Sequence, residues 1–103
     1  GMSLYPSAAN WAEKNNQCLT NMNDLVGLYG SEIMITEIGM PWTDSAACHL
    51  FIKDILSKTK LLPNNKGLGV FYWEPQGYNG WKGYTLGAFN NSGRPTGALD
   101  AFR

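Results

Sequence analysis

Two short apolar segments, each ending in a glutamate and a nearby proline, constrain the fold of this chain more than any other feature. Residues 33–36 are followed by Glu37, and residues 68–73 are followed by Glu74. Both segments are apolar, rich in β-branched or aromatic residues and too short for a helix, which is typical of buried parallel strands. Because parallel strands end at the same edge of a sheet, we expect Glu37 and Glu74 at one rim.

Helical patterns alternate with these strands. Residues 10–30 place apolar side chains at helical spacing: Leu19, Met22, Leu25, Val26 and Tyr29. Of these, the aromatic Tyr29 is assigned to the core. A second helix is predicted from a cap at Thr43 or Asp44 to a break at Pro63, with a face made of Ala47, Leu50, Phe51, Ile55 and Leu56. Phe71 fits strand periodicity and is assigned to the core as well.

The order of these elements defines the class of fold. Residues 2–6 resemble the end of a further strand, and residues 96–102 are predicted to form a last short helix. Strands that alternate with helices indicate βαβ units and a parallel sheet, so the chain is predicted to be α/β. Residues 1–103 are too few for more than one domain or a part of one.

The composition argues against several classes of partner. Eight basic residues balance eight acidic ones, so we expect no nucleic-acid partner. No apolar stretch reaches the roughly 18 residues that a membrane span requires, and the N-terminus lacks signal-peptide features. We therefore expect no membrane partner. Gly1 before Met2 is interpreted as the remnant of an expression tag.

Cys18, Cys48 and His49 do not form a metal-binding pattern. The cysteines are too far apart for a CxxC motif, and zinc requires about four ligands, so we predict no metal and no cofactor. Two buried free thiols are the favoured interpretation, with a disulfide as the alternative. His49 is expected to be a surface or packing residue on a helix.

The expected rim has the chemistry of a carbohydrate site. Two carboxylates roughly 5 Å apart can act as nucleophile and acid in glycoside hydrolysis, although one of them can instead bind substrate or orient its neighbour. Aromatic residues fall in or beside the loops of the same rim: Tyr5, Trp42, Trp73, Tyr78, Trp81 and Tyr84. Sugars have flat apolar faces edged with hydroxyls, which favours such rings next to amide and carboxylate groups.

Together with the end of the first helix, Asn23-Asp24-Leu25 with Tyr29-Gly30, three segments resemble in chain order the C-terminal part of family 53 glycoside hydrolases, the arabinogalactan endo-β-1,4-galactanases. They are Leu4-Tyr5-Pro6, Thr36-Glu37 with Pro41-Trp42-Thr43, and residues 67–75. The resemblance implies the C-terminal third of a (β/α)8 TIM barrel. Residues 1–103 would then be one partial domain that contains the seventh and eighth strands, their helices and the end of the sixth strand.

The resemblance also implies roles for individual residues. Glu37 matches the nucleophile of a retaining enzyme, whereas Tyr5, Trp42, Trp73 and Glu74 are assigned to substrate binding. The family's general acid/base lies in an Asn-Glu pair after the fourth strand, and this sequence has no Asn-Glu dipeptide. We therefore expect the chain alone to be inactive. The loops that hold calcium in some members lack the necessary carboxylates here, so we predict no calcium.

The implied substrate is a β-linked galactan-type polysaccharide. A carbohydrate-binding module without catalysis, built on the same aromatic rim, is the alternative. We also expect self-association, because a partial barrel leaves open sheet edges. Relatives are secreted or periplasmic, but the sequence does not fix the compartment.

Overall fold

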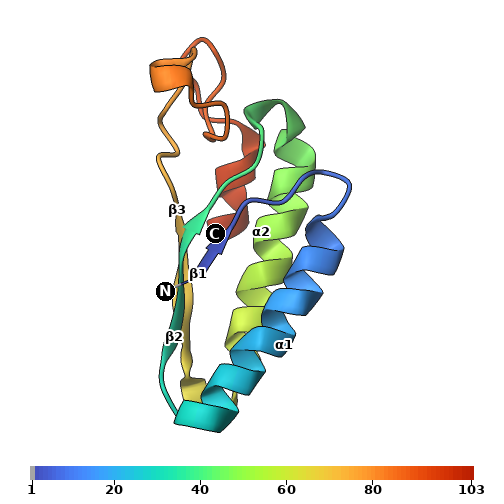
Figure 1. The fold of residues 1–103 in the computed structure, drawn as a ribbon. Coiled ribbons are helices and arrows are strands. Elements are labelled where there is room, and N and C mark those ends of the chain that lie inside the picture. Colours follow the sequence, from blue (N-terminus) through green and yellow to red (C-terminus); the bar gives the residue numbers. More distant parts are fainter. Residues whose placement is uncertain (1) are drawn as a thin grey trace.

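The computed structural model describes residues 2–103 as a parallel three-stranded sheet with two helices on one face (Figure 1). The strands β1 (Met2–Leu4), β2 (Ile33–Ile38) and β3 (Gly67–Tyr72) lie side by side in this order. Helix α1 (Trp11–Tyr29) connects β1 to β2, and α2 (Ser45–Lys60) connects β2 to β3. The predicted α/β class is confirmed. Gly1, interpreted as a tag remnant, lies outside the described residues.

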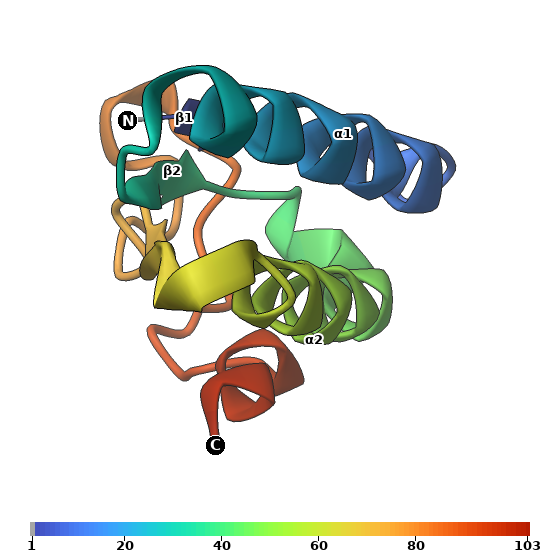
Figure 2. The same cartoon turned by 90° about the horizontal axis from the view of Figure 1, so that it is seen from below.

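Both helices lie on the same side of the strands. Figure 2 shows α1 and α2 next to each other, with the C-terminal 3-10 helix Gly97–Phe102 beyond α2. The side chain of Thr96 caps this last helix by accepting a hydrogen bond from the backbone N–H of Ala98 (3.4 Å). His49 holds it against α2, since its Nδ1 lies 2.9 Å from the Gly97 carbonyl oxygen. The last short helix and the packing role of His49 are therefore confirmed.

The hydrophobic core fills the space between the sheet and the helices. Its fully buried large side chains come from α1, β2, the segment after β2 and α2: Met22, Ile35, Ile38, Met40, Phe51, Ile52 and Ile55. Asn15 of α1 is buried among them, and its amide donates to the Phe51 carbonyl (3.2 Å) and to the Asp54 carboxylate (3.0 Å). This pair of bonds fixes how α1 lies on α2. Neither helix of the described chain is long and apolar enough to cross a membrane.

Two residues assigned to the core, Tyr29 and Phe71, are instead exposed, as are Leu25 and Leu50 of the apolar helix patterns. For the helix residues the pattern misleads because each helix contacts its neighbours along a narrower stripe than the apolar pattern suggests. In α1 the buried residues are Asn15, Cys18, Met22 and Val26, so Tyr29 points away and is 72% exposed. Phe71 lies in β3 and is 56% exposed.

Cys18 and Cys48 are buried free thiols. The favoured interpretation is confirmed, and the disulfide alternative is wrong. Burial raises the pKa of Cys18, and it raises the pKa of Cys48 to about 11. Both side chains thus behave as small apolar groups within the core.

Candidate functional site

Glu37 meets Tyr5 at the carboxyl ends of the strands. The phenol of Tyr5, one residue after β1, donates to Oε1 of Glu37 across 2.7 Å. Glu37 is the second-last residue of β2, because that strand runs to Ile38, two residues further than predicted. The bond therefore joins two neighbouring strands at one edge of the sheet.

One extra residue in β2 controls the direction of the Glu37 side chain. Residues 35–38 of β2 pair with residues 2–4 of β1 and with residues 70–72 of β3. Four residues of β2 therefore lie opposite three residues in each neighbouring strand. Such a mismatch is a β-bulge. Ile35 and Ile38 are both fully buried against the helices, although strict alternation of side chains along a strand would put them on opposite faces of the sheet. Without the bulge, Glu37 would share the helix-facing side with Ile33 and Ile35.

Tyr5 is held by the backbone that follows β2. A Cβ on Gly39 would lie 3.0 Å from the Tyr5 ring, so only a glycine lets the ring come this close. The Gly39 N–H donates to the Leu4 carbonyl (3.2 Å), which keeps the two segments in register. Partial burial and the neighbouring Glu37 carboxylate raise the pKa of Tyr5. The phenol consequently stays protonated and remains a hydrogen-bond donor to the carboxylate.

Glu74 lies at the same edge, two residues after β3. Its backbone φ of 45° lies in the left-handed region that non-glycine residues rarely adopt. Partial burial raises the pKa of Tyr84, and the charges of Glu74 and Glu37 raise it further. The Tyr84 phenol donates to the Trp73 carbonyl (3.1 Å), directly before Glu74. Tyr84 thus braces the end of β3, a contact that the sequence analysis missed.

The two predicted tryptophans occupy the loops around these carboxylates. Trp42 begins a 3-10 turn (Trp42–Asp44), and its N–H donates to the Thr85 carbonyl (3.1 Å). The Trp73 N–H donates to the Ile38 carbonyl (3.0 Å), and its side chain is about half exposed. Among residues 2–103, no side-chain hydrogen bond joins either tryptophan to Glu37. Among the described residues, Tyr5 is therefore the predicted site residue whose side chain hydrogen-bonds to Glu37.

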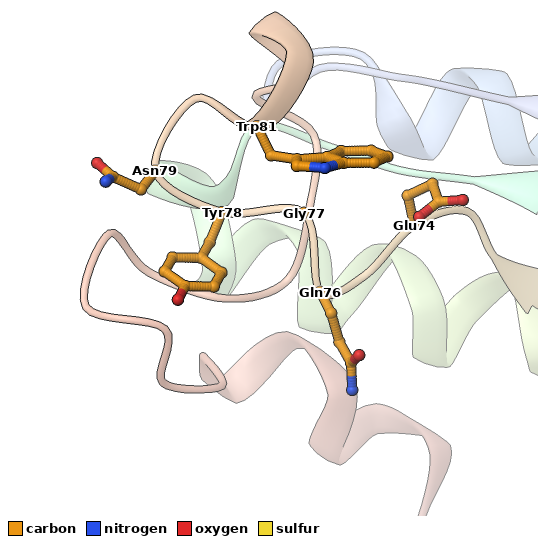
Figure 3. Close-up of a pocket in the computed structure, with 6 residues that line it drawn as sticks. All are labelled: Glu74, Gln76, Gly77, Tyr78, Asn79 and Trp81. Atoms are coloured by element: carbon orange, nitrogen blue, oxygen red, sulfur yellow. The ribbon is translucent and has the colours of Figure 1, made fainter.

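An open hollow continues the rim beyond Glu74 (Figure 3). Its lining comes from Glu74 and the following loop: Gln76, Gly77, Tyr78, Asn79 and Trp81. The sequence analysis counted the rings of this loop among the rim aromatics and based the alternative of a carbohydrate-binding module on them, but it did not include the loop among the substrate-binding residues. The density of aromatic and amide residues between 76 and 81 was the available signal.

A parallel α/β sheet with carboxylates and aromatic rings at its carboxyl edge is the arrangement of glycoside hydrolases built on parallel barrels. The family described as Glycosyl hydrolase family 53 matches residues 43–102 of this chain. The match covers more than half of the 103 residues, and the chain belongs to this family. It includes Trp73 and Glu74, whereas Tyr5 and Glu37 precede it.

The chain is also similar to a protein of Niallia circulans described as an uncharacterized protein in the bgaB 5′ region. The two are 27% identical over 119 aligned residues, which cover 93% of this chain. The alignment takes in 32% of the relative, so the chain spans about a third of that protein's length.

Proposed function

We propose that Glu37 is the nucleophile of a retaining glycoside hydrolase of family 53 that acts on a β-linked galactan-type polysaccharide. In this proposal the chain supplies the seventh and eighth βα units and the end of the sixth strand of a barrel. The observation that carries the proposal is the 2.7 Å hydrogen bond from Tyr5 to Glu37 at the strand ends. It leaves one carboxylate oxygen bonded and the other free to react.

The reaction uses these groups in separate roles. The free oxygen of Glu37 attacks the anomeric carbon, and the bond from that carbon to the leaving oxygen breaks. The result is an ester between the sugar and Glu37. Tyr5 orients the attacking carboxylate. Trp73 and Trp42 provide ring surfaces on which the sugar can stack, and Glu74 accepts hydrogen bonds from the sugar hydroxyls.

The isolated chain is expected not to hydrolyse polysaccharide. The leaving oxygen of a natural glycoside needs a proton, and general acid catalysis contributes about 10² to 10⁴-fold to the rate. The Asn-Glu pair that holds the acid in the family has no counterpart in this sequence. A reducing-sugar assay on β-1,4-galactan should therefore show no turnover. Turnover that disappears in Glu37→Gln would contradict this expectation and would make Glu74 the acid.

An activated substrate tests Glu37 without the acid. In a 2-fluoro β-galactobioside that carries a dinitrophenolate leaving group, the leaving group departs without a proton. The fluorine slows the breakdown of the ester between the sugar and Glu37. Mass spectrometry of the intact chain and of its peptides should find one adduct, on Glu37. Glu37→Gln should abolish the adduct and Glu74→Gln should retain it. An adduct on Glu74, or no adduct although the sugar binds, would contradict the assignment.

A carbohydrate-binding module without catalysis is the second candidate, and the hollow beside Glu74 favours it. The same labelling experiment separates the two functions. A module would bind galacto-oligosaccharides in a calorimetric titration and would form no covalent adduct with the activated sugar.

We further propose that the chain associates with copies of itself. Strands β1 and β3 are the edges of the sheet, and their outer backbone groups can pair with another chain. The aromatic ring of Phe71 and the side chain of Leu68 add exposed apolar surface to β3. Burying these groups would stabilise an assembly.

A further inference from the structure

The hydroxyl group of Tyr72 joins parts of the chain that follow two different strands. Tyr72 is the last residue of β3, and its phenol donates to the carbonyl oxygens of Leu86 (2.9 Å) and Gly87 (3.1 Å). The Sγ of Cys48, buried in α2, lies 3.9 Å from the same phenol oxygen. Burial raises the pKa of Tyr72, whereas a backbone hydrogen bond from Met40, in the segment after β2, lowers it. One hydroxyl thus connects β3, α2 and two segments beyond the strand ends.

These neighbours use the full hydrogen-bonding capacity of the phenol. A phenol has one proton to donate and lone pairs with which to accept. Since the proton points to the two carbonyls, the lone pairs accept from the Met40 N–H and the Cys48 thiol. The carbonyls belong to residues 86 and 87, and the second of these is buried. Removing the donor from such carbonyls is costly, so this part of the chain would move if the hydroxyl were lost.

The Leu86 carbonyl limits where the Tyr5 ring can lie. A Cβ on Gly39 would lie 3.0 Å from the Tyr5 ring and 3.1 Å from the Leu86 carbonyl oxygen. The ring and the carbonyl therefore share the space beside the Gly39 backbone, and in a closely packed structure a shift of one displaces the other. Tyr72 holds this carbonyl, and the Met40 N–H that faces the same phenol belongs to the residue directly after Gly39.

Backbone bonds hold the chain only on either side of this contact. The Thr85 carbonyl accepts from the N–H of Trp42 across 3.1 Å. The Ala88 N–H donates across 2.7 Å to a carbonyl of the segment directly after β3. Residues 86 and 87 lie between these two bonds, and their carbonyls accept from the Tyr72 side chain. The phenol therefore completes the attachment at the place where the chain meets the Tyr5 ring.

We propose that Tyr72 is a positioning residue for the reaction assigned to Glu37. Its hydroxyl keeps the Leu86 carbonyl beside Gly39, and together they define the slot in which the Tyr5 ring lies. From this slot the Tyr5 phenol donates to Glu37 in one fixed direction. Tyr72 thus acts on the carboxylate through Tyr5. The inference rests on the proposed function for the role of Glu37, whereas the arrangement of the slot is independent of that role.

Nuclear Overhauser contacts between the Tyr5 ring and the α-protons of Gly39 test the slot without any sugar. Tyr72→Phe retains the aromatic ring and removes the hydroxyl, so these contacts should lose intensity. Thr59→Val is the control, because it removes a buried hydroxyl that donates to the Ile55 carbonyl (2.8 Å) at the other end of β3. The control should keep the contacts. Unchanged contacts in Tyr72→Phe, or an equal loss in Thr59→Val, would overturn the proposal.

The rate at which the activated galactobioside labels Glu37 tests whether Tyr72 acts through Tyr5. Tyr72→Phe should slow labelling about threefold to tenfold, and Thr59→Val should not slow it. In a chain that already carries Tyr5→Phe, Tyr72→Phe should cause no further slowing, because the phenol that it positions is then absent. Two effects that multiply would refute the route through Tyr5.

The two measurements distinguish failure of the proposal from failure of the proposed function. Urea unfolding establishes that each variant is folded in the assay. A parent chain that is labelled, with Tyr72→Phe labelled at the same rate, would refute the positioning role and leave the proposed function intact. A parent chain that binds the sugar but is not labelled would contradict the role of Glu37, and the contacts between Tyr5 and Gly39 would then decide on Tyr72 alone.

Discussion

The hydrogen bond between Tyr5 and Glu37 depends on two residues that are 32 positions apart in the chain. Each was recognised from the sequence as a rim residue, since each follows an apolar segment. Their direct contact was not predicted, because it depends on β1 pairing with β2 and on the bare backbone of Gly39. Residue identity thus placed both side chains at the rim, whereas the pairing of strands decided which side chain hydrogen-bonds the carboxylate.

Tyr5→Phe should slow the labelling of Glu37 by the activated galactobioside about tenfold. The ring remains packed on Gly39, but the carboxylate loses a donor, and hydrogen bonds to charged groups contribute about 1.5–3 kcal/mol. The rate is measured by mass spectrometry over time. Tyr29→Phe is the control, because Tyr29 lies exposed on α1, and it should label at the original rate. Equal rates in both variants would show that Tyr5 does not orient Glu37.

At the scale of secondary-structure elements, periodicity located the helices and strands well. The strand β3 starts and ends within one residue of its predicted bounds, and α1 ends at Tyr29 with Gly30 as its cap, as expected. The bulge in β2 could not be predicted from the sequence, because one extra residue does not change the amino-acid composition by which a strand is recognised. The prediction therefore found Glu37 at a strand end but not the mismatch that turns it away from the helices.

Close packing of α2 on β3 predicts opposite effects for two glycine replacements. A Cβ on Gly67 would lie 2.0 Å from the Thr59 carbonyl oxygen, so Gly67→Ala must push the last turn of α2 away from β3. We expect the free energy of unfolding to fall by about 2 kcal/mol or more. Gly27 lies in α1 with no atom near its missing Cβ, so Gly27→Ala should stabilise by about 1 kcal/mol.

Urea unfolding followed by circular dichroism measures both glycine variants under the same conditions. A loss of stability in Gly27→Ala would indicate that α1 has a neighbour at that position. If Gly67→Ala were as stable as the parent chain, the contact between α2 and β3 would have to be looser than described.

At the scale of the whole molecule, the sheet is covered by helices on one face and bounded by two unpaired edges. Figures 1 and 2 show both helices on the same side of the strands. Open edges were expected because the resemblance implies a partial barrel. Phe71 was assigned to the core, since alternation alone cannot tell which face of a strand the helices cover. The described molecule therefore combines a packed core with apolar groups at its surface.

Self-association should be visible as a molar mass above 11.4 kDa that rises with concentration. Phe71→Lys should lower this mass, because a charge beside the edge strand opposes the pairing of edges. Leu61→Lys removes an apolar side chain that is 71% exposed at the end of α2, and it should have no effect. Light scattering coupled to size exclusion measures all three chains. A monomer of the parent chain at high concentration would contradict the assembly.

The stability of the fold should decline above pH 9. The pKa of Cys48 is raised from 9.0 to about 11, and those of Cys18, Tyr5, Tyr72 and Tyr84 are raised as well, with burial as the largest cause. Above pH 9 the unfolded chain releases these protons before the folded chain does, so unfolding becomes more favourable as pH rises. Their contribution is complete below pH 9.

Urea midpoints at pH 7, 9 and 10.5 measure this decline. Cys48→Ala should have a lower free energy of unfolding at pH 7 because it leaves a cavity. Its stability should also fall less between pH 9 and 11 than that of the parent chain, because the buried thiol is gone. A stability that is constant from pH 7 to 10.5 would contradict the buried, protonated state of these groups.

The strand order has a consequence for how such a rim can vary. Because β1, β2 and β3 lie side by side in chain order, Tyr5, Glu37 and the loop of residues 74–84 follow one another along the edge as they do along the sequence. A longer or shorter loop after one strand would therefore change one contact with the proposed sugar chain and leave the contacts at the neighbouring strands in place. Under the proposed function, substrate preference can therefore change at the end of β3 while the role proposed for Glu37 at the end of β2 is kept.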